Sequence, residues 1–193
     1  MDNIIGPPVT GENFFTGRDK DVETIIKMLS DGNSILLSGL RRIGKSSIML
    51  SVKKKLPTNW QVNYYDVQTH SYPSDLFSVL LNSICTSGIN NIILQSKTIP
   101  KRLISFLKEN LRKLGSEEVN MELKDEIINY WKPLTAAIET IISKSESPFI
   151  LILDEFPIFI ERMLKNGIKP TDVQEILSQF KRWRTEYPNF RMI

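Results

Sequence analysis

The residues of this chain best suited to chemistry form a glycine-bordered loop that ends in a lysine and two serines. Residues 39–46 read Gly-Leu-Arg-Arg-Ile-Gly-Lys-Ser, the pattern G-x-x-x-x-G-K-[ST]. Its glycines allow close backbone approach, so that successive N–H groups converge on phosphate oxygens. Lys45 would reach the outer phosphates, Ser46 would hold Mg²⁺ and Ser47 would donate to the inner phosphate. The predicted ligands of a nucleotide are Gly39, Leu40, Arg41, Arg42, Ile43, Gly44, Lys45, Ser46 and Ser47.

A second candidate is an apolar run that ends in two carboxylates. Residues 149–155 read Phe-Ile-Leu-Ile-Leu-Asp-Glu. Asp154 is suited to hold Mg²⁺ together with Ser46, and Glu155 to orient or deprotonate an attacking water. Alone, the pair is as consistent with the start of a solvated loop, but beside a phosphate loop it favours catalysis. We therefore predict Glu155 and Lys45 as catalytic residues and Ser46 and Asp154 as the metal ligands.

Strands and helices of a parallel sheet must position these groups. Residues 34–38 are a short apolar run, expected as a buried strand before the loop, and residues 46–55 have a helical pattern after it. Residues 60–68 are rich in aromatic and β-branched side chains and predict a second strand. Residues 149–153 are apolar throughout, as in a strand covered on both faces. The order predicts an α/β fold.

Helical spacing accounts for most of the remaining chain. An amphipathic face predicts a helix over 19–30, and three apolar stripes centred on 76–84, 103–111 and 134–142 predict a helical insertion at about 73–146. A capping-box pattern at Thr171 predicts the start of a last helix, and residues 190–193 have strand character.

Composition restricts the class of protein. The chain has 193 residues, 41% hydrophobic and 24% charged, which suits one globular domain. Its net charge of +3 is far from that of a dedicated nucleic-acid binder. One cysteine, Cys85, excludes an internal disulfide and favours the cytoplasm, and no export signal or membrane-spanning run is expected. Cys85 is expected in the core, and His70, the single histidine, in a surface loop.

Three stretches taken together carry a family resemblance. Phe-Thr-Gly-Arg at 15–18, the loop at 39–47 and Leu-Ile-Leu-Asp-Glu-Phe at 151–156 resemble the archaeal-type and STAND-related ATPases of the AAA+ branch of P-loop proteins. The resemblance spans about residues 12–193 and leaves 1–11 as an irregular lead. It implies a P-loop NTPase three-layer α/β/α sandwich with a mostly parallel sheet, ATP with Mg²⁺, and Glu155 as the catalytic carboxylate. It also implies that Phe15, Gly17 and Arg18 lie near the adenine.

The chain departs from this family's pattern at its end. In such proteins a strand after the last helix carries a residue that senses the γ-phosphate, and a further strand and a helical lid follow. Here the sequence stops at Ile193, so we expect a domain that is incomplete before its last strand and lid. The resemblance also implies that residues 190–193 insert between the phosphate-loop strand and the acidic strand.

Three functions remain open. The first is a Mg²⁺-dependent ATPase domain whose hydrolysis drives a conformational switch, with self-association or an effector protein as its partner. The second is a nucleotide-binding or protein-interaction module that does not hydrolyse, because the sensor and lid are missing. The third is a nucleic-acid-associated ATPase that uses residues 97–114. This stretch holds six basic residues and one acidic residue, Glu109, although a solvated helix face explains the charges as well. Arg41 and Arg42 contact the nucleotide or a neighbouring subunit, or simply solvate the loop.

A GTPase is disfavoured. The chain contains no [NT]-K-x-D motif to recognise guanine, and the acidic strand continues as Asp-Glu-Phe-Pro without the glycine of D-x-x-G.

Overall fold

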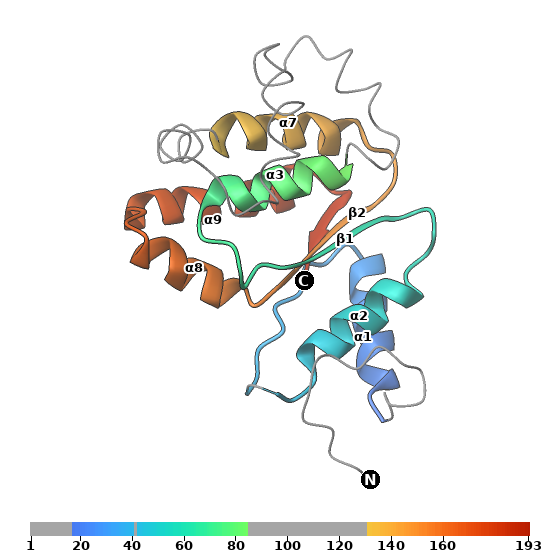
Figure 1. Ribbon diagram of the computed structural model, residues 1–193. Helices are drawn as coiled ribbons and strands as arrows, with labels where there is room; N and C mark the ends of the chain where they lie inside the picture. The colour runs from blue at the N-terminus through green and yellow to red at the C-terminus, as the bar shows by residue number, and fades with distance from the viewer. Residues whose placement is uncertain (1–16, 41, 85–130) are drawn as a thin grey trace. The chain divides into compact units, whose positions relative to one another are not determined.

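The computed structural model describes residues 17–40, 42–84 and 131–193, without the side chains of 82–84 (Figure 1). This part of the chain is an α/β structure with a small parallel sheet. The predicted lead at 1–11, the helix at 103–111, the basic stretch 97–114, Phe15, Arg41 and Cys85 lie outside these residues. The elements are α1 (Asp19–Ser30), α2 (Lys45–Lys55), β1 (Gln61–Asp66), α3 (Pro73–Ile84), α7 (Trp131–Lys144), β2 (Phe149–Asp154), α8 (Phe156–Lys165), α9 (Pro170–Glu186) and β3 (Phe190–Met192).

The described residues divide into two compact units. The sheet unit comprises the residues up to Asp66, Glu146–Asp154 and Arg184–Ile193. The helical unit comprises Val67–Ser145 and Glu155–Trp183. One of the points at which the chain passes between the units is the peptide bond between Asp154 and Glu155.

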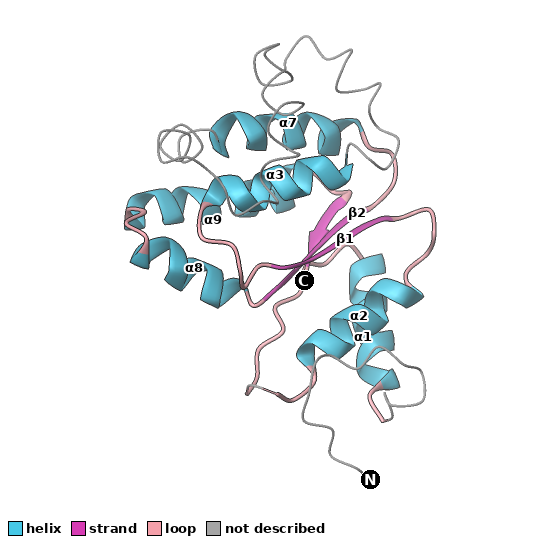
Figure 2. Cartoon of the chain, viewed as in Figure 1, coloured by secondary structure: helices cyan, strands magenta, loops and turns pink. Residues whose placement is uncertain are grey.

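The sheet unit is a parallel sheet covered on one face by two helices. Its strands have the order β1-β2-β3, and Asp66 is the register partner of Asp154 (Figure 2). The predicted strands at 60–68, 149–153 and 190–193 are therefore confirmed. One buried cluster joins α1 and α2 to the sheet, which explains the apolar spacing of both helices. Its members are Val22, Ile25, Leu29, Ile48, Met49, Val52, Leu56, Ile150, Ile152 and Ile193.

The predicted buried strand at 34–38 is wrong. The segment is a loop (Figure 2), and the side chain of Leu36 is 90% exposed. It does run beside β3, because the Ile35 amide donates to the Met192 carbonyl over 2.8 Å. The Met192 amide, however, donates to the Ser34 hydroxyl over 3.0 Å instead of to a backbone carbonyl. This side-chain acceptor replaces the next bond that a ladder would need.

The helical unit closes around aromatic rings. Phe77 of α3 is fully buried, and its ring centroid lies 6.0 Å from that of Trp131 on α7 and 5.7 Å from that of Phe180 on α9. Phe156 of α8 contacts Phe180 as well, with 5.9 Å between centroids. Contacts of this size dominate core energetics. Aromatic packing therefore joins all four helices of this unit.

Most of the predicted helices are confirmed, with three differences. The helix at 19–30 has the predicted bounds, and α2, α3, α7 and α9 occupy the other predicted sites within the described residues. However, α2 begins at Lys45, one residue before the predicted position 46, and α9 begins at Pro170, one residue before Thr171. No prediction covered α8, although the i, i+4 spacing of its buried residues Phe159 and Met163 and a proline in its first turn are helix signals.

Candidate functional site

The loop before α2 ends in a left-handed glycine that starts the helix. Gly44 is the N-cap of α2, with φ 89° and ψ 21°, a conformation that costs little only for glycine. The Ile48 amide donates to the Gly44 carbonyl over 3.0 Å, the first bond of the helix. The N–H groups of the first turn of α2 have no acceptor within the helix, and they lie at the positive end of the helix dipole. This turn contains Lys45, Ser46 and Ser47, the predicted phosphate ligands.

The first glycine of the loop lies against the side chain of Ile43. A Cβ on Gly39 would lie 2.6 Å from Cδ1 of Ile43, closer than real Cβ atoms approach. The loop therefore folds back on itself so that its fifth residue covers its first. Between them, Arg42 is exposed and has φ 67°, a conformation unusual for a residue with a side chain.

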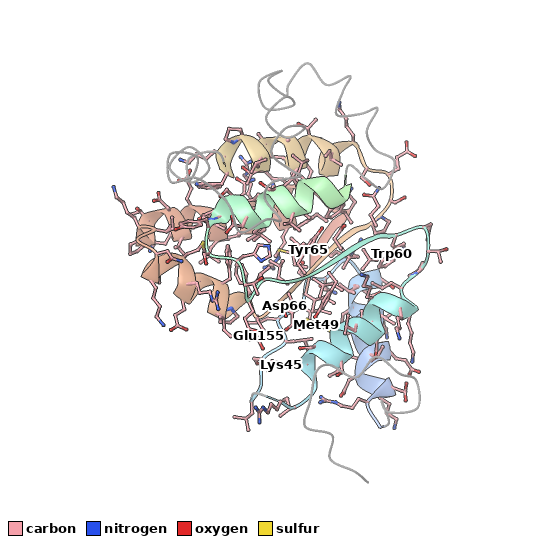
Figure 3. The ribbon with its side chains drawn as sticks, viewed as in Figure 1. Lys45, Met49, Trp60, Tyr65, Asp66 and Glu155 are labelled. Atoms are coloured by element: carbon pink, nitrogen blue, oxygen red, sulfur yellow. The ribbon has the colours of Figure 1, made fainter. Side chains whose placement is uncertain are left out.

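Lys45 reaches back over the loop (Figure 3). Its Nζ donates to the carbonyl of Gly39 over 3.2 Å and to that of Leu40 over 3.0 Å. The ammonium is thus held across the mouth of the loop by backbone oxygens. Because an ammonium has three N–H donors, these two bonds leave capacity for an anionic ligand.

Arg18 connects the start of α1 to the loop. Its Nε donates to Oδ2 of Asp21 over 2.7 Å, and its Nη1 donates to the Ile43 carbonyl over 2.8 Å. Gly17, just before it, has φ 88°. Arg18 therefore supports the loop at 39–46 through the backbone carbonyl of Ile43. A position of Gly17 and Arg18 beside adenine stays a prediction.

Asp154 projects from the sheet face that α2 covers. Side chains alternate along a strand, so Asp154 shares a face with Ile150 and Ile152, which pack against α1 and α2. It is 4% exposed, and its Oδ2 accepts a hydrogen bond of 2.9 Å from the Tyr64 hydroxyl. The predicted metal ligand is therefore a buried carboxylate on the face that carries the helix of Ser46.

Two residues of β1 were not singled out by the sequence analysis. Tyr64 is the hydrogen-bond partner of Asp154. Asp66, labelled in Figure 3, lies at the end of β1 and is the register partner of Asp154. Asp66 is exposed and shares the sheet face of Asp154. The available signal was that the strand at 60–68 contains an acid near its end, as the strand at 149–154 does. The carboxyl ends of two neighbouring strands, β1 and β2, therefore bring carboxylates together.

Glu155, the predicted catalytic carboxylate, begins the helical unit. It is half-buried and is the N-cap of α8 in a left-handed conformation, with φ 56° and ψ 29°. Such a conformation is costly for a residue with a side chain and is frequent at functional sites. The two neighbouring acids are thus assigned to different units.

Within the described ranges, no three His, Cys, Asp or Glu side chains are grouped as a metal site. A cation bound here would therefore need Ser46, Asp154 and oxygens of its ligand.

No helix among the described residues has the length and apolar character that a membrane crossing needs. His70 lies in a loop, as expected, and is half-buried rather than on the surface.

Comparisons with family models, with curated proteins and with solved structures found no match to this chain.

Proposed function

We propose that this chain is an ATP-binding P-loop ATPase domain in which Mg²⁺-dependent hydrolysis of ATP drives a conformational switch. The observation that carries the proposal is the Lys45 ammonium, held over its loop by the Gly39 and Leu40 carbonyls at the start of α2. This arrangement presents a cation, a helix N-terminus and loop amides to one site. That combination suits the phosphates of a nucleotide.

The sheet unit would bind the triphosphate. Amides of the first turn of α2 would donate to phosphate oxygens, and the left-handed Gly44 keeps that turn free of a Cβ at its entrance. Lys45 would turn its ammonium to the outer phosphates, and Ser47 would donate to the inner one. Arg18 would keep the loop in this form through its bond to the Ile43 carbonyl.

Ser46 and Asp154 would hold Mg²⁺ with the phosphates. Oxygen ligands of this kind suit Mg²⁺, which is commonly bound by one or two carboxylates plus phosphates. Asp154 and Asp66 are register partners on one sheet face, so their like charges repel, and a divalent cation offsets that repulsion. When bound, Mg²⁺ neutralises charge on the transferred phosphoryl group.

Glu155 would act on the attacking water. The water oxygen forms a bond to the γ-phosphorus, the bond from this phosphorus to the ADP oxygen breaks, and the water proton passes to the Glu155 carboxylate. The three-layer P-loop NTPase sandwich, self-association or an effector partner, and a cytoplasmic location are parts of the same proposal.

Replacement of the loop lysine tests the proposal. Lys45→Ala removes a charge-assisted contact of roughly 1.5–3 kcal/mol, so the affinity for ATP should fall about tenfold to a hundredfold. Isothermal titration calorimetry with Mg-ATP measures this. The matched control is Lys54→Ala, in the last turn of the same helix, which should bind as the wild type does. Equal affinities for the wild type and Lys45→Ala, or no ATP binding to the wild type, would refute the proposal.

A further inference from the structure

Tyr64 holds the carboxylate on which the proposed magnesium site depends. Its hydroxyl donates to Oδ2 of Asp154 over 2.9 Å, and Asp154 is 4% exposed. A carboxylate so buried needs hydrogen bonds from the protein to keep its charge and its orientation. We infer that Tyr64 is a positioning residue of the magnesium site, which orients Asp154 toward the cation. This inference rests on the proposed function.

The Tyr64 ring is itself held on two sides. Tyr64 packs against the buried cluster that joins α1 and α2 to the sheet. In addition, Nζ of Lys53 lies 5.9 Å from the centroid of the ring, within the range of a cation–π attraction. Packing and this attraction restrict the ring, so the hydroxyl has a defined position before any ligand arrives. Such support is what a precise binding site requires.

The same helix carries the other proposed metal ligand. Ser46 lies in the first turn of α2, and Lys53 follows it by two helical turns, on the same side of the helix. One helix, α2, thus carries both Ser46 and Lys53. Lys53 contacts the Tyr64 ring, and the Tyr64 hydroxyl donates to Asp154. This connection through α2 and β1 links the two proposed ligands.

This connection matters because Mg²⁺ demands nearly ideal octahedral geometry. A hydrogen-bond partner behind a ligating carboxylate typically accounts for a 10- to 100-fold difference in metal affinity. Tyr64→Phe removes the hydroxyl and keeps the ring, so the core packing and the contact with Lys53 remain. The variant therefore isolates the effect of the hydrogen bond on Asp154.

The experiment measures ATP binding by calorimetry over a series of Mg²⁺ concentrations and in EDTA. For Tyr64→Phe we expect the Mg²⁺ concentration that gives half of the full affinity gain to rise about 10- to 100-fold. The affinity for ATP in EDTA should stay at its wild-type value, while the midpoint of thermal unfolding falls modestly because a buried carboxylate loses one hydrogen bond. A loss of affinity in EDTA as large as that in Mg²⁺ would overturn the inference, because it would indicate a structural role.

Two further variants separate failure of this inference from failure of the proposed function. Tyr65→Phe removes one hydroxyl from the opposite face of the same strand and should keep the wild-type Mg²⁺ dependence. Asp154→Asn should abolish the gain in affinity from Mg²⁺. If Asp154→Asn loses the gain and Tyr64→Phe keeps it at wild-type Mg²⁺ concentrations, only the inference about Tyr64 is wrong. If Asp154→Asn keeps the gain, or the wild type has none, the proposed magnesium site is wrong and the inference falls with it.

Discussion

The two units surround their carboxylates with different donors. In the helical unit, Glu139 of α7 accepts hydrogen bonds from three side chains of α9, and one of them is the guanidinium of Arg182. In the sheet unit, Asp154 accepts from the neutral hydroxyl of Tyr64 at the end of a strand. A carboxylate neutralised by a neighbouring guanidinium fastens two helices together. A phenol orients a carboxylate without itself adding a positive charge beside it.

The helical core and the loop region of the sheet unit place apolar side chains differently. Phe77 and Trp183 of the helical unit are fully buried. In the sheet unit, Leu36, before the loop at 39–46, and Leu40, within it, are 90% and 80% exposed. Burial stabilises the helical unit, whereas the segment around the proposed site gives up part of that stabilisation. The comparison therefore predicts that substitutions in the helical core lower stability and that substitutions around the loop alter ligand binding.

The largest effect is expected at Glu155, where the chain passes between the units. Glu155→Gln keeps the size of the side chain but removes its capacity to accept a proton. Turnover of ATP should fall on the order of 100- to 10,000-fold, while ATP affinity stays near its wild-type value. A steady-state phosphate-release assay and calorimetry on the same samples test both parts.

The matched control for Glu155 is replacement by glycine. Glu155→Gly also removes the carboxylate, but it suits the left-handed φ of 56° and should not lower the thermal midpoint. Both variants should be equally inactive. If the wild type turns ATP over no faster than Glu155→Gln does, this chain is a nucleotide-binding module that does not hydrolyse.

The next largest effect is expected in the aromatic core of the helical unit. Phe77→Ala removes a fully buried ring that contacts Trp131, Phe180 and Trp183, so the free energy of unfolding should fall by about 3–5 kcal/mol. Chemical denaturation followed by tryptophan fluorescence measures this. ATP affinity should be unchanged at temperatures where the variant is folded.

Leu177→Ala is the control for Phe77→Ala. It shortens an apolar side chain that is 42% exposed on α9. The free energy of unfolding should therefore fall far less than it does for Phe77→Ala. Equal losses for the two variants would contradict the difference between the units.

Much of the sheet and its helices was predictable because their signals are local. The spacing of Val22, Ile25 and Leu29 predicted α1 with its observed bounds, since the same side chains enter the core. The run at 149–153 predicted β2, whose six residues are all buried. The loop motif likewise predicted a helix directly after the glycine loop, and Gly44 is the N-cap of α2. Each of these features depends on residues within a few positions of one another.

Features that depend on distant partners were not predictable in the same way. The bond from Tyr64 to Asp154 joins residues 90 positions apart, and the Arg18 bond to the Ile43 carbonyl joins the ends of two elements. Nothing in the local pattern at β1 indicates which strand will lie beside it. The prediction at 34–38 failed for a related reason. Its apolar run has strand character, but a ladder also needs backbone partners, and the Ser34 hydroxyl takes one of them.

The smallest effect is expected at Leu36, where the strand prediction and the structure disagree most directly. Leu36→Ser replaces a side chain that is 90% exposed, so the free energy of unfolding should change by no more than about 0.5 kcal/mol. Leu37→Ser, one position along, replaces a half-buried side chain that packs against the core cluster and should lose about 1 kcal/mol or more. Urea denaturation of the two variants compares them. If residues 34–38 formed a buried strand, both faces of that strand would be covered. Leu36→Ser would then lower the free energy of unfolding as much as Leu37→Ser does, and this segment would bury its apolar side chains as fully as the helical core does.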